Sequence, residues 1–225
     1  MSTQMTFAKD TSGRTLGQWV IALITLFVGL IIAHLGVTMF LISELGTDTF
    51  TVFVQGLSIL SGLSIGTVHV ITLCLIMLLL LIFTKDYIKP GSVICAFFGG
   101  PIIDFFLWVF DGRISASSPM YLRILVMILG LVILALGMSV VIQSEAGTGP
   151  NDLVAIVLTD KLKRFQFRWV RVGCDVFFVI FGSLLGGVVG VGTVAAVILT
   201  GPVVQFWLPR SQKLVKKIYG KFGMD

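Results

Sequence analysis

One acidic residue follows a Gly-Pro step inside an apolar part of the chain. Asp104 comes one helical turn after Gly100 and Pro101. Proline removes a backbone hydrogen bond and kinks a helix. A charge at the bilayer centre costs about 2.5–3.5 kcal/mol and indicates function. Asp104 is therefore a candidate for a substrate or ion pathway. The alternative is a tolerated kink, with an acid that is paired inside the bundle or hydrated near its surface.

A second Gly-Pro step occurs later in the chain. Gly201 and Pro202 precede Gln205, which stands where the first step has Asp104. Gly and Pro interruptions at matching places in two halves of a chain are a sequence pointer to a transporter binding site. Because Gln205 keeps polarity without charge, any proton chemistry at these two steps would be asymmetric.

Two Ser-Glu-x-Gly-Thr motifs place Glu44 and Glu145 directly after long apolar stretches. A carboxylate in this place can bind a cation, take up a proton or form part of a gate. The alternative is a solvated acid at a helix end, where Gly46 and Gly147 would close the helix in a left-handed cap. A duplicated cap would recur as well, so recurrence leaves both interpretations open.

The two histidines, His34 and His69, both lie in apolar stretches. A histidine can relay protons near neutral pH; a single hydrogen bond inside a bundle is the alternative. Neither stretch has a second histidine at metal-ligand spacing, so we predict no metal site. The chain has no P-loop and no dinucleotide fingerprint, and we therefore predict no cofactor.

Enzyme signals are weak. Gly-Leu-Ser occurs at 56–58 and 62–64, which faintly suggests an intramembrane serine nucleophile. His69 falls in the same predicted helix as Ser64, whereas a catalytic pair normally comes from separate helices. We therefore predict that the chain is not an enzyme.

The composition sets the class of protein. Of 225 residues, 56% are hydrophobic and 12% are charged, and the mean hydropathy is +1.05. A soluble domain usually carries about 25% charged residues. These values exclude a soluble globular domain, a disordered chain and a nucleic-acid-binding domain. They predict a polytopic protein whose main partner is the lipid bilayer.

Six apolar stretches are long enough, or nearly so, for the roughly 20 residues that a spanning helix needs. They are 19–42, 65–83, 92–110, 124–142, 172–189 and 191–208. Backbone groups in lipid must bond internally, so the prediction is an all-α membrane protein with six transmembrane helices.

The basic residues set the orientation. Six spans place 14 of the 16 Lys and Arg residues on the side of the N-terminus, and only Arg113 and Arg123 on the other. The positive-inside rule then makes both termini cytoplasmic. The basic clusters at 161–171 and 210–221 are expected to lie near anionic lipid. The 14 residues are Lys9, Arg14, Lys85, Lys89, Lys161, Lys163, Arg164, Arg168, Arg171, Arg210, Lys213, Lys216, Lys217 and Lys221.

An internal duplication accounts for the matching motifs. A shift of 101 residues aligns 29–48 with 130–149 at nine of twenty identical positions. Each copy holds three spans, an odd number, so the second copy would enter the membrane from the opposite side as a 3+3 inverted repeat. Short interfacial or re-entrant segments are expected after the first helix of each repeat, at 50–61 and from 150.

The predicted organisation has five parts. They are an N-terminal cytoplasmic segment (1–18), a first repeat (19–110), an external loop (111–123), a second repeat (124–208) and a basic tail (209–225). On the fifth span, Gly182, Gly186 and Gly190 recur every four residues. This spacing lets helices approach closely, either between the repeats or in a homodimer.

Several motifs resemble the bacterial YczE/YyaS/YitT family of membrane proteins. They are Leu-Gly at 35–36, Gln-Gly-Leu-Ser at 55–58, Gly-Leu-Ser-Ile-Gly-Thr at 62–67, Gly-Pro-Ile-Ile-Asp at 100–104 and Gly-Thr-Gly-Pro-Asn-Asp at 147–152. The first copy departs from the last motif at 46–51, where it lacks the proline and the acid. The resemblance implies a bacterial inner-membrane protein and brings no established activity.

Two functional hypotheses follow. The first is a secondary transporter or permease for a small solute, with its site among Asp104, Gln205, the two Gly-Pro steps, Glu44 and Glu145. The second is a membrane scaffold or regulatory protein that acts through its basic cytoplasmic surface.

Overall fold

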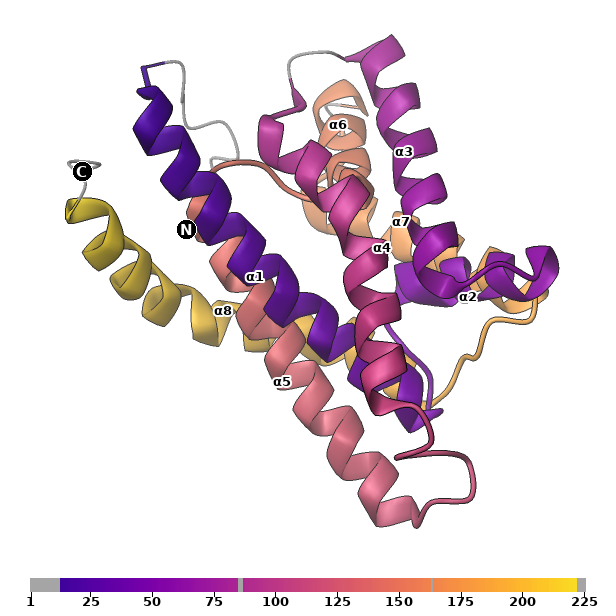
Figure 1. Cartoon of the computed structure of the whole chain (residues 1–225). Helices are drawn as coiled ribbons and strands as arrows, with labels where there is room; N and C mark the ends of the chain where they lie inside the picture. The colour runs from indigo at the N-terminus through magenta and orange to yellow at the C-terminus, as the bar shows by residue number, and fades with distance from the viewer. Residues whose placement is uncertain (1–12, 85–86, 163, 222–225) are drawn as a thin grey trace.

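The computed structural model describes residues 13–84, 87–162 and 164–221 (Figure 1). Three lysines used for the orientation, Lys9, Lys85 and Lys163, therefore lie outside the described residues, as do parts of the predicted terminal segments. The described residues form helices and contain no strand. The helices are α1 (Leu16–Ser43), α2 (Thr49–Ser61), α3 (Ile65–Phe83), α4 (Pro90–Phe110), α5 (Met120–Ser144), α6 (Pro150–Leu162), α7 (Phe167–Leu184) and α8 (Val191–Gly220).

Within the described residues, five helices are long and apolar enough to cross a membrane: α1, α3, α4, α5 and α8. Large apolar side chains cover their outer surfaces; Trp108 on α4 is 75% exposed and Ile198 on α8 is 62% exposed. An apolar surface of this kind is stable only in contact with lipid or protein. The all-α prediction is confirmed, and the short segments after the first helix of each half form α2 and α6.

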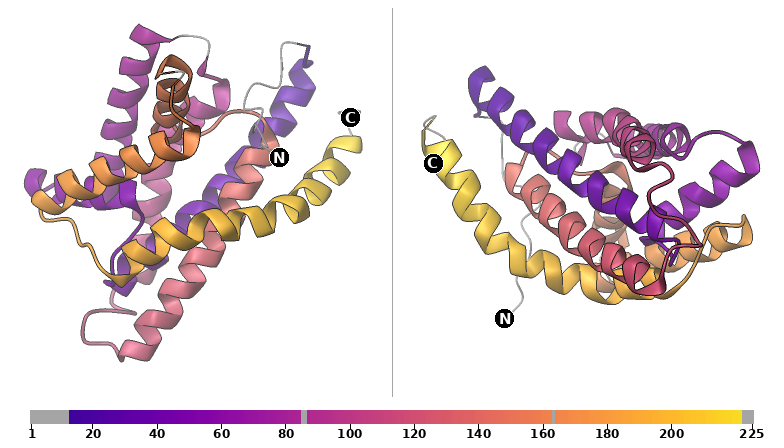
Figure 2. Two further views of the ribbon diagram at one scale, coloured as in Figure 1. Left: turned by 180° about the vertical axis from the view of Figure 1, so that it is seen from behind. Right: turned by 60° about the horizontal axis from the view of Figure 1, so that its bottom comes forward.

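The sixth predicted span differs from the helix found there. α7 begins at Phe167, earlier than 172, and its first turns carry Arg168, Arg171 and Asp175. It ends at Leu184, and residues 185–190 are not helical. Figures 1 and 2 show α7 beside α2 and across the direction of α3. α7 is not among the helices long and apolar enough to span.

The prediction that Gly182, Gly186 and Gly190 lie on one face of a helix is wrong, because Gly186 and Gly190 lie beyond the end of α7. Gly182 remains inside α7 and packs against α2. A Cβ at Gly182 would lie 2.6 Å from the backbone nitrogen of Phe53, and a Cβ at Gly56 would lie 2.5 Å from the carbonyl oxygen of Gly182. These two glycines let α2 and α7 approach at backbone distance.

α1 and α5 form the central antiparallel pair (Figure 1). A Cβ at Gly36 would lie 2.6 Å from the carbonyl oxygen of Gly130, and a Cβ at Gly137 would lie 2.7 Å from that of Gly29. The close contact leaves no room for side chains at these crossings. A buried cluster that includes Phe40 and residues of α4, α5 and α8 fills the space beside the pair.

The two glutamates that follow these helices adopt the left-handed conformation themselves. Glu44 has φ 52° and Glu145 has φ 54°, and each is the C-terminal cap of its helix. The expectation that Gly46 and Gly147 close the helices is therefore wrong. Both glycines have positive φ, but they lie two residues further on, where the loop passes the start of another helix.

Each of these loops bonds to the start of a helix from the other half. The backbone N–H of Gly91 at the start of α4 donates to the carbonyl oxygen of Ala146 at 3.0 Å. The backbone N–H of Gly192 at the start of α8 donates to the carbonyl oxygen of Leu45 at 2.7 Å. The chain ends of the two long helices are thereby held against α4 and α8. α8 contains Pro202 and Pro209 and curves along its length (Figure 2).

Candidate functional site

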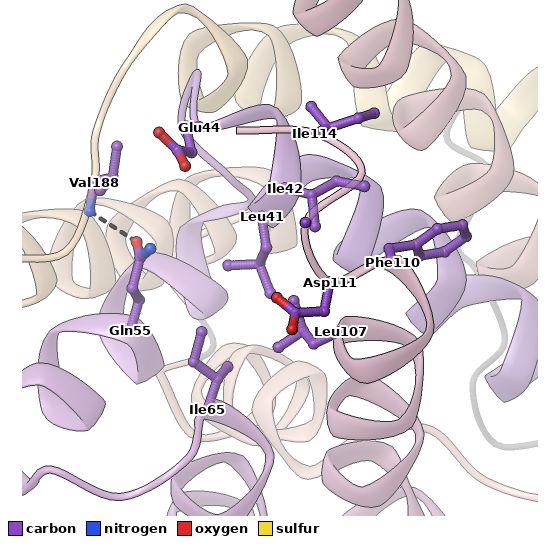
Figure 3. A pocket seen from close by; sticks show the side chains of 11 residues that line it. Leu41, Ile42, Glu44, Gln55, Ile65, Leu107, Phe110, Asp111, Ile114 and Val188 are labelled. Carbon is purple, nitrogen blue, oxygen red and sulfur yellow. Dashed lines mark hydrogen bonds between the residues drawn. The ribbon is translucent and has the colours of Figure 1, made fainter. Parts of the chain in front are cut away.

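A cavity of about 470 Å³ opens where α1 and α4 end (Figure 3). Its polar lining consists of the carboxylates of Glu44 and Asp111 and the amide of Gln55. The remaining lining is mostly aliphatic and aromatic, and none of the described residues that line it is basic. The side-chain oxygen of Gln55 accepts a hydrogen bond from the backbone of Val188 at 2.8 Å, which fixes the loop before α8 as one wall.

Glu44 faces this cavity with its carboxylate unpaired among the described residues, while an arginine binds the backbone behind it. The guanidinium of Arg123 on α5 donates to the carbonyl oxygens of Ser43 at 2.8 Å and Glu44 at 2.9 Å. A positive charge at the C-terminus of α1 is favourable because it meets the negative end of the helix dipole. The arginine therefore closes the helix and leaves the carboxylate in the cavity.

Glu145, at the end of α5, has a different environment. Arg14 forms an ion pair with its carboxylate at 2.9 Å and also donates to the carbonyl oxygen of Ser144 at 3.5 Å. The hydroxyl of Tyr219 near the end of α8 donates to the same carbonyl at 2.9 Å. The two predicted acids thus lie at opposite ends of the α1–α5 pair, one facing a cavity and one in an ion pair.

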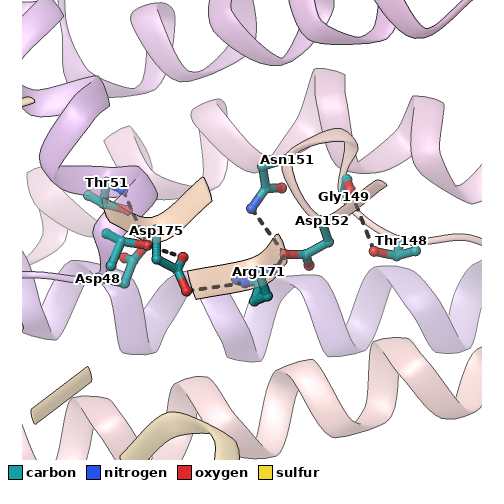
Figure 4. A network of polar contacts seen from close by, with 9 residues as sticks. Asp48, Thr51, Thr148, Gly149, Asn151, Asp152, Arg171 and Asp175 are labelled. Atoms are coloured by element: carbon teal, nitrogen blue, oxygen red, sulfur yellow. Dashed lines mark hydrogen bonds and ion pairs between the residues drawn. The ribbon is translucent and has the colours of Figure 1, made fainter. Parts of the chain in front are cut away.

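The starts of α2 and α6 meet charged residues of α7 (Figure 4). The hydroxyl of Thr49, the first residue of α2, donates to Asp175 at 2.7 Å. Arg171 forms ion pairs with Asp152 in the first turn of α6 and with Asp175 at 3.4 Å. Arg171 is thus paired with Asp175, which lies four residues further along α7. Sequence reasoning missed Asp152 as its second partner, although the acid of the Gly-Thr-Gly-Pro-Asn-Asp motif was visible.

Asp48 caps α2 beside this network, with its carboxylate accepting from the backbone N–H of Thr51 at 3.1 Å. Burial raises the pKa of Asp48, hydrogen bonds from Thr51 and Thr47 lower it, and nearby Asp175 raises it further. Among the described residues, the network joins Arg171 to the carboxylates of Asp152 and Asp175, with the capping carboxyl of Asp48 beside it.

Asp104 on α4 is half-buried and caps the start of the preceding helix, α3. One carboxylate oxygen accepts from the hydroxyl of Ser64 at 2.6 Å and the other from the backbone N–H of Gly66 at 2.8 Å. Gly66 packs on Gly100, since a Cβ at Gly100 would lie 2.8 Å from the carbonyl carbon of Gly66. The motifs at 62–67 and 100–104 therefore form one contact between α3 and α4. Pro101 lies inside α4 on its exposed side.

The second Gly-Pro step lies elsewhere. Gly201, Pro202 and Gln205 are exposed on α8, and no atom lies within 4 Å of a Cβ placed on Gly201. Among the described residues no hydrogen bond joins Gln205 to Asp104. The structure thus brings Asp104 to the start of α3 and leaves its counterpart on the outer surface of the helices.

The two histidines are brought together. The ring centroids of His34 and His69 are 5.4 Å apart, and Phe50 of α2 packs on His69 at the same distance. Both rings are buried between α1, α3 and α4. The sequence places these residues 35 positions apart and gives no signal of the contact. It likewise gives no signal for Asp111 in the cavity or for the arginines at the two helix ends, whereas Gln55 begins the Gln-Gly-Leu-Ser motif at 55–58.

A family model described as "Family of unknown function (DUF6198)" matches residues 20–209. The chain belongs to this family. It is 31% identical over 190 residues to "Uncharacterized membrane protein YczE" of Bacillus subtilis (strain 168), covering 84% of this chain and 86% of the relative. It is 27% identical over 182 residues to "Uncharacterized protein YyaS" of the same organism, covering 81% and 90%. These matches confirm the resemblance inferred from the sequence.

A third relative of this DUF6198 chain is an "Uncharacterized protein" of Haemophilus influenzae, 26% identical over 183 residues and covering 81% of both chains. No solved structure matches the chain. The relative described as a membrane protein and the five apolar helices agree that the chain is a membrane protein.

Proposed function

We propose that this chain is a secondary transporter or permease for an unidentified small solute, in the bacterial cell membrane and with both termini cytoplasmic. In this proposal α7 is the sixth crossing, and the two halves form a 3+3 inverted repeat. The hydrogen bonds from Gly91 to Ala146 and from Gly192 to Leu45 support the repeat, because a shift of 101 residues exchanges one for the other. The glycine contacts between α1 and α5 follow the same symmetry, because the shift turns Gly36 into Gly137 and Gly29 into Gly130.

The observation that carries the proposal is the meeting of α2 and α6 on α7. Thr49 binds Asp175, and Asp152 binds Arg171, so one short helix from each half begins at the same charged network. In secondary transporters, the ends of discontinuous helices at the interface of the repeats hold substrate and coupling ions. A charged network among apolar helices is costly unless it serves such a role.

The cavity supplies the entrance in this proposal. It is lined by Glu44 and Asp111 and lies on the side that the positive-inside rule makes external. At the other end Arg14 and Glu145 are paired. One open and one closed end are typical of a transporter in one of its two alternating states.

The test is a comparison of metabolite uptake and efflux. A strain that lacks the protein is complemented with the wild type, with Arg171→Gln or with Arg168→Gln. Arg168 is exposed on the same helix beside Trp169 and serves as the matched control. We expect a solute whose transport returns with the wild type and the control but not with Arg171→Gln. Counterflow of that solute in proteoliposomes then tests the purified chain.

The scaffold hypothesis predicts the opposite pattern. If reversing the charges of Lys213, Lys216 and Lys217 abolishes the cellular phenotype while Arg171→Gln, Asp104→Asn and Pro101→Ala have no effect, the transporter proposal is wrong. The topology is tested separately by labelling single cysteines placed at residues 87 and 116. The proposal requires residue 87 to be inside and residue 116 to be outside.

A further inference from the structure

His34 and His69 direct the same ring atom at one point on α4. An ideal Cβ on Gly99 would lie 2.8 Å from Nε2 of His34 and 2.9 Å from Nε2 of His69. The ring planes are 78° apart, and the two residues are only 9% and 6% exposed. Residue 99 must therefore be a glycine to leave space for both nitrogens.

The hydrogen bonding of the pair leaves ring nitrogens available. Nδ1 of His34 lies 2.9 Å from the carbonyl oxygen of Leu30. Because a carbonyl only accepts, we assign the hydrogen of the neutral ring to Nδ1, and Nε2 of His34 then presents a lone pair toward Gly99. Nδ1 of His69 is buried and has no hydrogen-bond partner among the described residues. Buried polar atoms without a partner are rare and indicate a role or an absent ligand.

The groups packed around the two rings come from α2 and α4. α2 contributes the ring of Phe50, and α4 contributes the backbone of Gly99, with the buried thiol of Cys95 one turn earlier. Within the described part of the chain, no carboxylate or basic side chain makes a hydrogen bond or charge contact with either ring. Two like charges at this separation repel, so the first proton bound disfavours a second.

We propose that His34 and His69 form a single proton-binding site, which couples proton movement to solute movement. This inference rests on the proposed transporter function. The proton adds to the lone pair of a ring nitrogen that points toward Gly99, in one of the two histidines. No bond of the chain breaks in this step. The proton leaves to water when the site is exposed on the opposite side. The shift of 101 residues places Ala135 and Val170 at the equivalent positions, so one half alone carries the site.

The chain has only two histidines, which makes the test specific. Protein labelled with ¹⁵N-histidine in lipid nanodiscs is titrated between about pH 5 and pH 8, where imidazole changes charge. We expect both rings to respond together, with one proton bound by the pair. His34→Gln should move the titration of His69, and Gly99→Ala should disturb both rings. Gly201→Ala, where a Cβ meets nothing within 4 Å, is the control and should change neither.

Two outcomes overturn the proposal. Rings that stay neutral across this pH range rule out a proton site, and a His69 titration that is unchanged by His34→Gln rules out a shared one. If the pair titrates but the metabolite comparison finds no solute, the proton site stands and the transporter proposal fails. Once a solute is known, His34→Gln should abolish its proton-driven accumulation and spare its counterflow. Loss of both activities would indicate a structural role instead.

Discussion

Asp104 on α4 accepts a hydrogen bond from the backbone N–H of Gly66 on α3 at 2.8 Å. The first amide groups of a helix have no partner within the helix, and the positive end of its dipole attracts a carboxylate. The acid that sequence reasoning places in a solute pathway therefore also caps the neighbouring helix. Its structural and functional roles must be separated by experiment.

Removing this cap should destabilise the protein. Asp104→Ala loses the bonds to Ser64 and Gly66, and we expect a loss of about 1–2 kcal/mol, the range of other N-terminal caps. Asp104→Asn keeps an oxygen for Gly66 and should lose less. The measurement is the midpoint of thermal unfolding in detergent. Equal midpoints for wild type and Asp104→Ala would contradict the capping role.

The contact of α3 with α4 should not tolerate a methyl group at Gly100. A Cβ there meets the carbonyl carbon of Gly66 at 2.8 Å and Cγ2 of Val70 at 2.7 Å. We expect Gly100→Ala to cost about 1–3 kcal/mol, typical of overpacking. The duplication provides the control, because Gly201 occupies the equivalent position and its Cβ would meet nothing within 4 Å. Equal thermal midpoints for the two variants would refute the close contact.

The stability of the protein should depend on the ionisation of Asp48. Burial raises the pKa of Asp48, so the folded chain favours the protonated carboxyl more than the unfolded chain does. The protonated carboxyl therefore contributes stability that is fully present below the usual carboxyl pKa. This stability is lost as pH rises through the raised pKa of Asp48. Asp48→Asn cannot ionise and keeps an oxygen to cap Thr51. It should therefore unfold at a higher temperature than wild type near neutral pH.

The pH dependence provides the control for Asp48→Asn. Its advantage should shrink as pH falls toward about 4, where the wild-type carboxyl is protonated as well. Thermal midpoints of both chains across this range test the sign. An advantage that grows in acid would show that the carboxylate form stabilises the fold.

Arg171 should be the most sensitive residue of the charged network. Its removal leaves Asp152 and Asp175 without their cation, and we expect Arg171→Gln to cost about 1–3 kcal/mol. The loss stays below that of a fully buried pair, because the three side chains are partly exposed. Adding Asp175→Asn should recover part of the loss, since it removes one unpaired charge. A double variant less stable than Arg171→Gln would contradict the pairing.

The apolar pattern predicts most of the helices, because a spanning helix needs a long apolar run whatever its neighbours are. It fails at α7, where the run continues from Leu184 into residues 185–190 although the helix ends. Gly187 is buried there against the backbone of Val52 on α2. An apolar loop packed on another helix has the same composition as a membrane span, so hydropathy alone does not separate them.

The candidate site was predicted less completely than the helices. Asp104 and Glu44 were identified by type, but their partners Ser64 and Arg123 lie 40 and 79 residues away in sequence. Only tertiary packing decides such contacts. One signal was available, because Ser64 and Thr67 have the spacing of a helix cap, and a helix start next to a buried acid is a natural partner for it.

The carbonyl oxygen of Ser144 accepts hydrogen bonds from both Arg14 and Tyr219, which stand near opposite ends of the described chain. The beginning of α1 and the end of α8 are therefore fastened at one point. A linker between the end of α8 and the start of α1 would permit a circular permutant that opens in the loop between α4 and α5. Such a permutant would be synthesised with the second half first. Its assembly would reveal whether the order in which the halves enter the membrane matters for the fold.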